Sequence, residues 1–314
     1  MSDPKDSHVL PVTEELSRRG VAFEVFDPAS YPNGSTVTIT SCGAGVDVYL
    51  HCDTHLDLAN VRSVWYRRPG SFAISDQLKP EEAEWLRAEC SHAIRTVWDE
   101  IPALWVSHPD AIRRASVKVK QLDTALKLGF SIPRFTITND EEDASDFISS
   151  CPSGVVVKSL NSPVITYRDQ VCTLYTHLLT ADDREELNSV RFGPTYLQEF
   201  VKKSMDVRVT VFDDEVFAVG IKSTSSEDAL IDFRRAEIYD LPHEVINIPE
   251  DLKQLCVQLV QRLNLKFGAI DLLLKPNGDY LFLEVNPNGQ WYWLEWVTGL
   301  PMVRSLCNLL MSAK

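Results

Sequence analysis

The chain of 314 residues has few features of a secreted or membrane protein. Its seven cysteines are odd in number, scattered, and never spaced as CxxC, which argues against a disulfide framework or a zinc site. No apolar run is long enough to cross a bilayer, and the first six residues are too polar for a signal peptide. We therefore expect a cytoplasmic protein that has no membrane partner.

Basic residues are also scarce. Lys and Arg number 31 against 45 Asp and Glu, so the net charge is -14. No local basic cluster offsets this charge, and a nucleic acid is therefore not an expected partner. The motifs of several common enzyme classes are missing as well, because no P-loop (GxxxxGKS/T), HExxH or GxSxG pattern occurs.

What the sequence does contain is an alternation of helix and strand patterns, in a chain long enough for two or three lobes. In the first third the glycines Gly43 and Gly45 predict a turn, since no third glycine or helix follows to make a dinucleotide loop. Helices are predicted over 9–19 and 80–100, and strands over 21–26, 36–41, 46–51 and 61–66.

The rest of the chain continues this alternation and becomes richer in strands. Helices are predicted over 116–128, 140–150 and 249–263, and strands over 154–158, 195–200, 207–212 and 216–221. The expected fold class is therefore α/β, or α+β.

The most informative segment is 267–286, which reads as two apolar strands joined at a turn containing Asn277 and Gly278. Asn-Gly is among the strongest hairpin signals. Counting outward from a turn centred between these two residues places Asp271 opposite Glu284, with Asn286 on the same face. Like charges so opposed are destabilising unless something lies between them.

Two carboxylates and an amide oxygen therefore converge within apolar strands, where burial without compensation is costly. Hard oxygen donors without His or Cys favour Mg²⁺ or Mn²⁺, so we predict that Asp271, Glu284 and Asn286 bind metal. The alternative is that Asp271 and Glu284 face solvent and pair with lysines. This interpretation is less favoured, because the neighbours of both residues are apolar.

Cations that could face phosphate groups lie elsewhere in the chain. Lys118 begins a predicted helix, and Lys158 ends a predicted strand; each, taken singly, is more often an ordinary surface lysine. Asp206 and Arg208 share one face of a strand, and residues 232–235 (Asp-Phe-Arg-Arg) form another mixed cluster. For these clusters the alternative is a surface ion pair contributing at most about 1 kcal/mol.

The order of these segments resembles the ATP-grasp superfamily, and more closely the ligases that mature microviridins and related graspetides. The resemblance covers nearly the whole chain. Its most specific stretches are 64–69 (Val-Trp-Tyr-Arg-Arg-Pro), 198–211, and 283–291 (Leu-Glu-Val-Asn-Pro-Asn-Gly-Gln-Trp). Glu-Val-Asn-Pro alone is typical of ATP-grasp enzymes in general, whereas Asn-Gly-Gln-Trp and Trp-Tyr-Arg-Arg-Pro look like the peptide-maturing branch.

The resemblance implies a role for each candidate residue. Lys118 and Lys158 would contact phosphate, and Asp206 would lie near the ribose. Arg208 and Arg234 would contact phosphate or an acyl phosphate, with Asp232 beside them as a third catalytic candidate. The adenine would be bound by the segment Gln198, Glu199, Phe200 and Val201, and two Mg²⁺ ions by Asp271, Glu284 and Asn286.

The resemblance also implies an organisation and a partner. We expect an N-terminal lobe over 1–107, a central lid over 108–195 and a C-terminal lobe over 196–314, with ATP between the last two. Family members bind the leader of a ribosomal precursor peptide, and 165–183 is the candidate leader surface. A homodimer is expected as well. One departure is that no hydrophobic strand precedes the first helix here.

Two other functions stay open at this point. The carboxylate hairpin fits equally an ATP-grasp ligase that joins an amino acid or small amine to a carboxylate. A non-catalytic nucleotide-binding protein is less favoured, because the predicted metal ligands and lysines are all present. The sequence does not distinguish ester from amide products.

Overall fold

Two units divide the chain in the computed structural model, which describes residues 1–313 apart from 42, 44, 53–57, 162, 169, 227 and 228. One unit comprises Met1–Pro109 and Pro301–Lys314, and the other comprises Asp110–Leu300. The predicted lid and most of the predicted C-terminal lobe thus lie in one unit, whereas residues 301–314 belong with the N-terminal residues.

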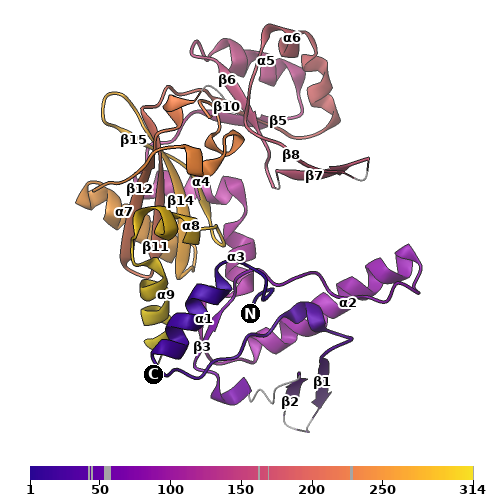
Figure 1. Ribbon diagram of the computed structural model, residues 1–314. Helices are drawn as coiled ribbons and strands as arrows, with labels where there is room; N and C mark the ends of the chain where they lie inside the picture. Colours follow the sequence, from indigo (N-terminus) through magenta and orange to yellow (C-terminus); the bar gives the residue numbers. More distant parts are fainter. Residues whose placement is uncertain are drawn as a thin grey trace. The chain divides into compact units, whose positions relative to one another are not determined.

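The first unit packs a long helix against short strands (Figure 1). Its core combines Phe26, Leu50 and Val64 with Ile94 and Trp98 of that helix. Its helices are α1 (Val9–Arg18), η1 (Pro28–Ser30), η2 (Leu58–Asn60), α2 (Pro80–Asp99) and α9 (Met302–Met311), and its strands are β1 (Thr36–Ser41), β2 (Val46–His51), β3 (Ser63–Trp65) and β4 (Leu104–Val106).

Most predictions for this unit are confirmed. β1 and β2 pair antiparallel as the predicted hairpin, although Cys42 and Ala44 of its turn lie outside the described residues. The strand predicted over 21–26 is wrong, because this stretch has no ladder partners and buries only Phe26. The strand predicted over 61–66 is shorter, β3, and pairs in parallel with β4.

The Trp-Tyr-Arg-Arg-Pro stretch forms backbone hydrogen bonds with the first residues of the chain. The Arg67 N–H donates to the Met1 carbonyl (2.9 Å), and the Asp3 N–H donates to the Arg68 carbonyl (2.9 Å). The guanidinium of Arg67 is fully buried, with Nη2 3.4 Å from His8 Nδ1 and Nε 3.5 Å from Asp6 Oδ2. The structure assigns no strand to residues 1–8, as the sequence predicts.

The second unit contains the segments predicted to carry the chemistry. Its helices are α3 (Pro109–Ala115), α4 (Lys118–Leu128), α5 (Glu141–Ser149), α6 (Ala181–Glu185), η3 (Leu187–Phe192), η4 (Ser223–Ser225), η5 (Phe233–Arg235), η6 (Ile238–Asp240), α7 (Glu250–Arg262) and α8 (Tyr292–Thr298). Its strands are β5 (Phe135–Thr138), β6 (Val155–Lys158), β7 (Val164–Tyr167), β8 (Gln170–Thr173), β9 (His177–Leu178), β10 (Thr195–Glu199), β11 (Met205–Phe212), β12 (Glu215–Ile221), β13 (His243–Val245), β14 (Phe267–Leu274) and β15 (Tyr280–Asn286).

Three antiparallel sheets organise this unit. A five-stranded sheet has the order β13-β12-β11-β14-β15, a four-stranded sheet has the order β5-β10-β6-β9, and β7 and β8 form a separate ribbon. Side chains of α4 and α7 pack on the five-stranded sheet, where Leu122, Leu259 and Ile270 are fully buried. A second core combines α5 with β6, β10 and η3.

Local signals set the ends of these helices. Gly129 ends α4 in the left-handed conformation (φ 102°), which glycine adopts without a steric penalty. Asp140 begins α5 by accepting hydrogen bonds from the N–H groups of Glu142 and Asp143. The predicted boundaries of both helices are therefore confirmed to within two residues.

Candidate functional site

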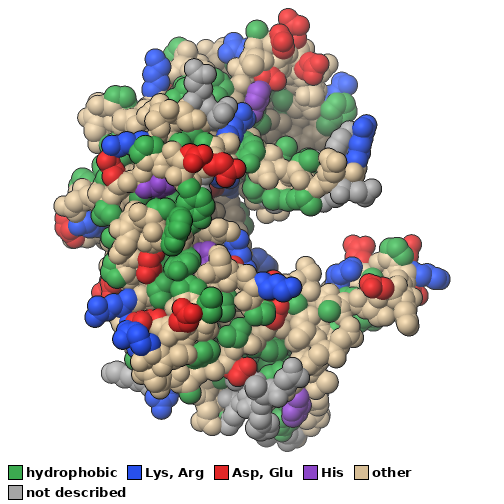
Figure 2. Space-filling model, viewed as in Figure 1, with side chains coloured by type: hydrophobic (Ala, Val, Ile, Leu, Met, Phe, Trp, Pro, Cys, Tyr) green, Lys and Arg blue, Asp and Glu red, His purple; other side chains and the backbone are tan. Residues whose placement is uncertain are grey.

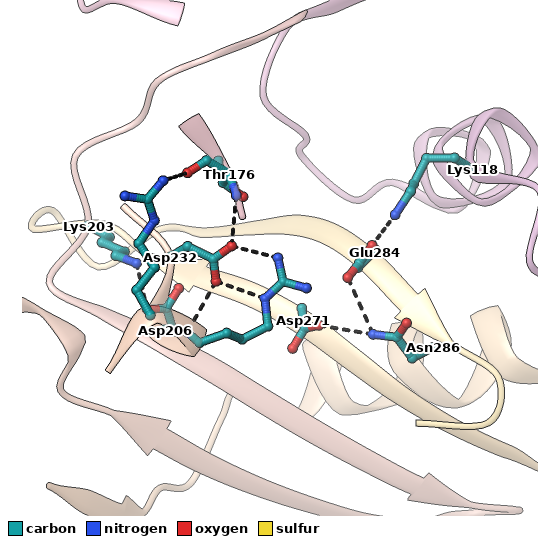
Figure 3. Close-up of polar contacts among 10 residues, drawn as sticks. Lys118, Thr176, Lys203, Asp206, Asp232, Asp271, Glu284 and Asn286 are labelled. Atoms are coloured by element: carbon teal, nitrogen blue, oxygen red, sulfur yellow. Dashed lines mark hydrogen bonds and ion pairs between the residues drawn. The ribbon is translucent and has the colours of Figure 1, made fainter. Parts of the chain in front are cut away.

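The predicted carboxylate hairpin is present in the five-stranded sheet. Asp271 of β14 and Glu284 of β15 are register partners, and Asn286 pairs with Ala269. Asn286 Nδ2 donates to Asp271 Oδ2 (3.2 Å) and to Glu284 Oε1 (3.4 Å), so the three side chains share one face (Figure 3). The predicted convergence of these side chains is confirmed.

The turn that creates this opposition differs from the predicted one. Lys275 donates to Asp279, and Gly278 (φ 92°) donates to Lys275, so the loop is longer than a two-residue turn. This loop puts Leu272 opposite Phe282, which is one residue out of the predicted register. A β-bulge between that pair and Asp271 then adds a residue to β15 and restores the opposition of the carboxylates.

Each carboxylate has a cationic partner. Lys118 at the start of α4 forms an ion pair with Glu284, and Arg208 Nε of β11 lies 2.7 Å from Asp271 Oδ1. Burial raises the pKa of Asp271 to about 6, although Arg208 opposes this rise. Burial also disfavours the Glu284 carboxylate, but Lys118, Lys158 and Arg234 together outweigh it and lower the pKa of Glu284 to about 2. Glu284 is therefore ionised at neutral pH, whereas burial and the charge of Glu284 both favour the protonated form of Asp271.

Gln121 explains how Lys118 reaches Glu284. This buried side chain donates to the Val285 carbonyl (2.8 Å) and accepts from the Val285 N–H (3.2 Å), which fixes α4 to β15. Lys118 lies one helical turn before Gln121, and residues three apart share a helix face. Gln121 was not predicted as a site residue, because its only signal in the sequence is an amide on the apolar face of a helix.

Lys158 and Arg234 add positive charge to the same cluster. Lys158 ends β6, and burial lowers its pKa to about 8, while the charge of Glu284 opposes that shift. The hydrogen bonds with Asp232 raise the pKa of Arg234 above its ordinary value, with Glu284 and Asp271 adding to the effect. Two carboxylates thus share a site with Lys118, Lys158, Arg208 and Arg234.

Asp232 is engaged in holding other groups. It accepts hydrogen bonds from Arg234 Nε (2.8 Å) and from the Thr176 N–H (3.0 Å), while Arg235 Nη2 donates to the Thr176 carbonyl (3.0 Å; Figure 3). Burial opposes its ionisation, yet these bonds keep the pKa of Asp232 well below its ordinary value. This geometry suits positioning Arg234 better than proton transfer.

Asp206 is buried and has two partners that the sequence analysis missed. Lys203 Nζ lies 2.6 Å from Asp206 Oδ2, and the Ser223 hydroxyl donates to the same oxygen. Asp206 and Arg208 are each less than a tenth exposed, so neither belongs to a surface ion pair. Lys203 lies only three residues before Asp206, so its spacing was a signal in the sequence. Ser223 follows the end of another strand, β12, and no local pattern connects it with Asp206.

The predicted adenine segment offers few free backbone donors. Gln198 is buried and donates to the Tyr196 hydroxyl (3.0 Å), and the Glu199 side chain accepts from Arg134 Nε (3.0 Å). The Phe200 N–H donates to the Gly154 carbonyl (2.9 Å). Among the backbone hydrogen bonds of the described residues, none is donated by the Val201 N–H. This N–H is therefore available to donate to a bound ligand.

The stretch after β15 returns to the site. Arg208 Nη1 donates to the Gln290 carbonyl (3.2 Å), and the buried Trp291 packs edge-on against Phe212 (5.3 Å between ring centroids). A Cβ at Gly289 would lie 2.6 Å from the Ala269 side chain, so only glycine fits where the chain crosses β14. These contacts explain the glycine and the tryptophan of the Asn-Gly-Gln-Trp sequence.

The donor set fits a magnesium–nucleotide site. Mg²⁺ in such sites is bound by one or two carboxylates, and phosphates and water complete its octahedron. Asp271 and Glu284 supply that number, and in the described part of the chain no three acidic, His or Cys side chains gather as a self-sufficient metal site. The flanking cations suit phosphate oxygens.

Comparisons with known proteins identify the domain families of the chain. Residues 115–309 match the model of the RimK-like ATP-grasp domain, and residues 4–113 match the MvdD pre-ATP grasp domain. No curated protein sequence gives a significant match. Among the described residues, no helix has the length and apolarity needed to cross a membrane.

Several solved structures share the fold over almost the whole chain. A Chryseobacterium gregarium RiPP-associated ATP-grasp ligase, in complex with ADP and a leader and core peptide, is 26% identical (TM-score 0.91; 100% of this chain and 96% of that chain covered). Macrocyclase MdnB from Microcystis aeruginosa MRC is 26% identical (0.81; 99% and 97%). ATP-grasp ligase PsnB with minimal precursor, Mg and ADP is 26% identical (0.78; 99% and 95%).

Proposed function

Because this chain belongs to the RimK-like ATP-grasp family, whose model matches more than half of it, we propose that it is an ATP-dependent peptide ligase. Its substrate is a ribosomally made precursor peptide, in which it joins Asp or Glu side-chain carboxylates to Ser or Thr hydroxyls or to Lys amines. The observation that carries the proposal is the Asp271–Glu284 pair surrounded by Lys118, Arg208 and Arg234. The peptide complexes of the similar ligases support the substrate class.

In this proposal, different residues of the second unit bind the metal, phosphate, adenine and ribose parts of Mg-ATP. Asp271, Glu284 and Asn286 would hold two Mg²⁺ ions, or Mn²⁺ in their place, and Lys118 and Lys158 would contact the phosphates. The segment 198–201 would bind the adenine, with the Val201 N–H as a donor, and Asp206 would lie near the ribose. Bound Mg²⁺ would neutralise charge on the transferring phosphoryl group.

The reaction has two steps. An oxygen of the substrate carboxylate attacks the γ-phosphorus of ATP, the bond to the bridging oxygen breaks, and ADP leaves. The hydroxyl or amine then attacks the carbonyl carbon of the acyl phosphate, phosphate leaves, and the nucleophile loses its proton. Arg208 and Arg234 stabilise the negative charge that spreads over the phosphoryl oxygens in each step. Asp232 keeps Arg234 in place.

The ribbon β7–β8 is the proposed leader surface; it overlaps the candidate segment 165–183, of which Asp169 lies outside the described residues. Val164, Val171 and Leu174 are exposed on or next to it, and Figure 2 shows apolar side chains along this part of the molecule. An exposed apolar ribbon can take up an amphipathic peptide segment. A bound leader raises the effective concentration of the core peptide at the site.

We expect Val171→Asp to weaken binding of the precursor by about tenfold, because a charge replaces an apolar side chain that is 75% exposed on the ribbon, and tenfold corresponds to about 1.4 kcal/mol. Nucleotide binding should not change. Fluorescence anisotropy with labelled precursor measures the affinity, and Val245→Asp, on an edge strand of the five-stranded sheet, is the matched control. Equal affinities of the wild type and Val171→Asp would contradict the assignment.

The products test the proposed function itself. The enzyme is incubated with Mg-ATP and a precursor encoded beside its gene, whose core is rich in acidic residues and in Thr or Lys. Mass spectrometry should show the loss of one water per crosslink, with stoichiometric ADP and phosphate. Release of AMP would contradict the mechanism, and a free amino acid as acceptor would support the small-molecule alternative.

The setting of the reaction completes the proposal. We place the enzyme in the cytoplasm, where ATP is abundant and where the described cysteines, all free thiols, remain reduced. The lobes over 1–107, 108–195 and 196–314 remain our functional division of the chain. The enzyme acts as a homodimer.

A further inference from the structure

A buried polar cluster surrounds Asp206 near the start of β11. Lys203 Nζ lies 2.6 Å from Asp206 Oδ2, and the Ser223 hydroxyl donates to the same oxygen. Asp206 is 7% exposed and Ser223 is fully buried, and Figure 3 shows Lys203 pointing toward Asp206. Groups buried this deeply are stable only when they are paired, so the two donors hold the carboxylate in one orientation.

The two oxygens of Asp206 are used unequally. Both donors bind Oδ2, and none of the hydrogen bonds and ion pairs of the described residues involves Oδ1. The carboxylate cannot turn without breaking both bonds at Oδ2, so Oδ1 keeps a fixed direction. A carboxylate only accepts hydrogen bonds, so the ligand group that suits Oδ1 is a hydroxyl or an N–H donor.

Ser223 is placed by the end of β12 and by the short helix η4. Asp206 of β11 pairs with Ile221 of β12, and Ser223 comes two residues after Ile221. The next residue of η4 is fixed as well, because the Thr224 hydroxyl donates to the Ser204 carbonyl (3.1 Å). The strand pairing and this hydrogen bond together hold the serine hydroxyl against the carboxylate.

The position of Asp206 along the chain indicates which part of a nucleotide it faces. The proposed adenine segment, 198–201, comes shortly before it. Arg208, two residues after it on the same face of β11, pairs with Asp271 of the proposed metal site. Two residues of a strand span roughly 6–7 Å. Asp206 thus lies between the groups proposed for adenine and for phosphate, where a nucleotide has its sugar, and the donors of a ribose are its hydroxyls.

We propose that Ser223 and Lys203 are positioning residues that make Asp206 select for ribose, so that the site prefers adenine nucleotides over their deoxy forms. Asp206 Oδ1 accepts the hydrogen bond of a ribose hydroxyl, and Ser223 acts only through Asp206. A site built to pair with a substrate hydroxyl rejects an analogue that lacks it, because the acceptor is then left unpaired. The inference rests on the proposed nucleotide site and adds the residues that set its sugar specificity.

Isothermal titration calorimetry of the full chain with Mg²⁺ and ADP, 2′-deoxy-ADP or 3′-deoxy-ADP tests the proposal without a precursor. The wild type should bind ADP at least about tenfold more tightly than one or both deoxy forms. Ser223→Ala should lose most of this preference, because its affinity for ADP falls about five- to tenfold while that for the disfavoured deoxy form stays unchanged. Ser225→Ala, at an exposed position of η4, is the matched control and should keep the wild-type preference.

Equal affinities of the wild type for the three nucleotides would overturn the inference, and this comparison needs no variant to fold. An undiminished preference in Ser223→Ala would also overturn it, as would an equal loss of affinity for all three nucleotides, which is the effect of a residue with a structural role alone. These results would leave the ligase reaction standing. No binding of ADP by the wild type would overturn the proposed nucleotide site together with the inference.

Discussion

Glu284→Gln should lower the rate of ATP-dependent ligation at least about 100-fold, which corresponds to about 2.7 kcal/mol of transition-state stabilisation. The substitution keeps the size of the side chain but removes a charge from the proposed metal site, and with it the pairing of Lys118 with Glu284. Steady-state ADP release with precursor measures the effect. Glu215→Gln, exposed on β12 of the same sheet, is the control and should be close to wild type.

The same variant also tests the electrostatics of the protein without nucleotide. Repulsion from Asp271 alone would predict that Glu284→Gln is more stable than the wild type. Because Lys118 lowers the pKa of Glu284, we expect the opposite, a loss of roughly 1–2 kcal/mol in the free energy of unfolding, since both groups are partly exposed. Denaturant unfolding at neutral pH measures this loss. A gain in stability would show that the carboxylate repulsion dominates.

Lys158→Met should weaken ATP binding by about 30-fold or more, because it removes a desolvated ammonium facing the phosphates, a loss of about 2 kcal/mol. The pKa of about 8 adds a signature. Phosphate binding favours the protonated lysine, so wild-type affinity should fall as the pH rises above about 8, and this fall should be absent in Lys158→Met. Isothermal titration calorimetry across pH 7–9 tests both points.

The control for this experiment is Lys120→Met. Lys120 lies on α4 two residues from Lys118, and its side chain is exposed. Its loss should change neither the affinity nor the pH dependence. If Lys158→Met and Lys120→Met bind nucleotide equally well, Lys158 is an ordinary structural lysine and the phosphate role is wrong.

The site could be predicted from sequence where local rules determine it. A strand pairing places Asp271 opposite Glu284, and a helix start and a strand end place Lys118 and Lys158. Even there the predicted two-residue turn is wrong: the loop is longer, and the bulge in β15 restores the pairing of Asp271 with Glu284. Asp271 and Glu284 are still opposite each other because the bulge shifts the register by one residue, which cancels the shift of one residue caused by the longer loop.

Partners set by tertiary structure could not be predicted. Thr176 and Ser223 reach Asp232 and Asp206 from segments far away in sequence, and neither has a distinctive local pattern. The strand predicted over 21–26 failed for a related reason: β-branched and aromatic residues favour a strand only where a neighbour supplies the ladder and covers a face. Propensity alone does not supply that neighbour.

The central claim is that Asp271, Glu284 and Asn286 bind a divalent ion together with the nucleotide. Electron paramagnetic resonance of Mn²⁺ tests it most directly, because the signal of free Mn²⁺ decreases on binding and no peptide substrate is needed. The wild type should bind Mn²⁺ tightly when ADP is present, and Glu284→Gln should lose most of this binding while Glu215→Gln keeps it. Equal Mn²⁺ binding by the wild type and Glu284→Gln would contradict the account.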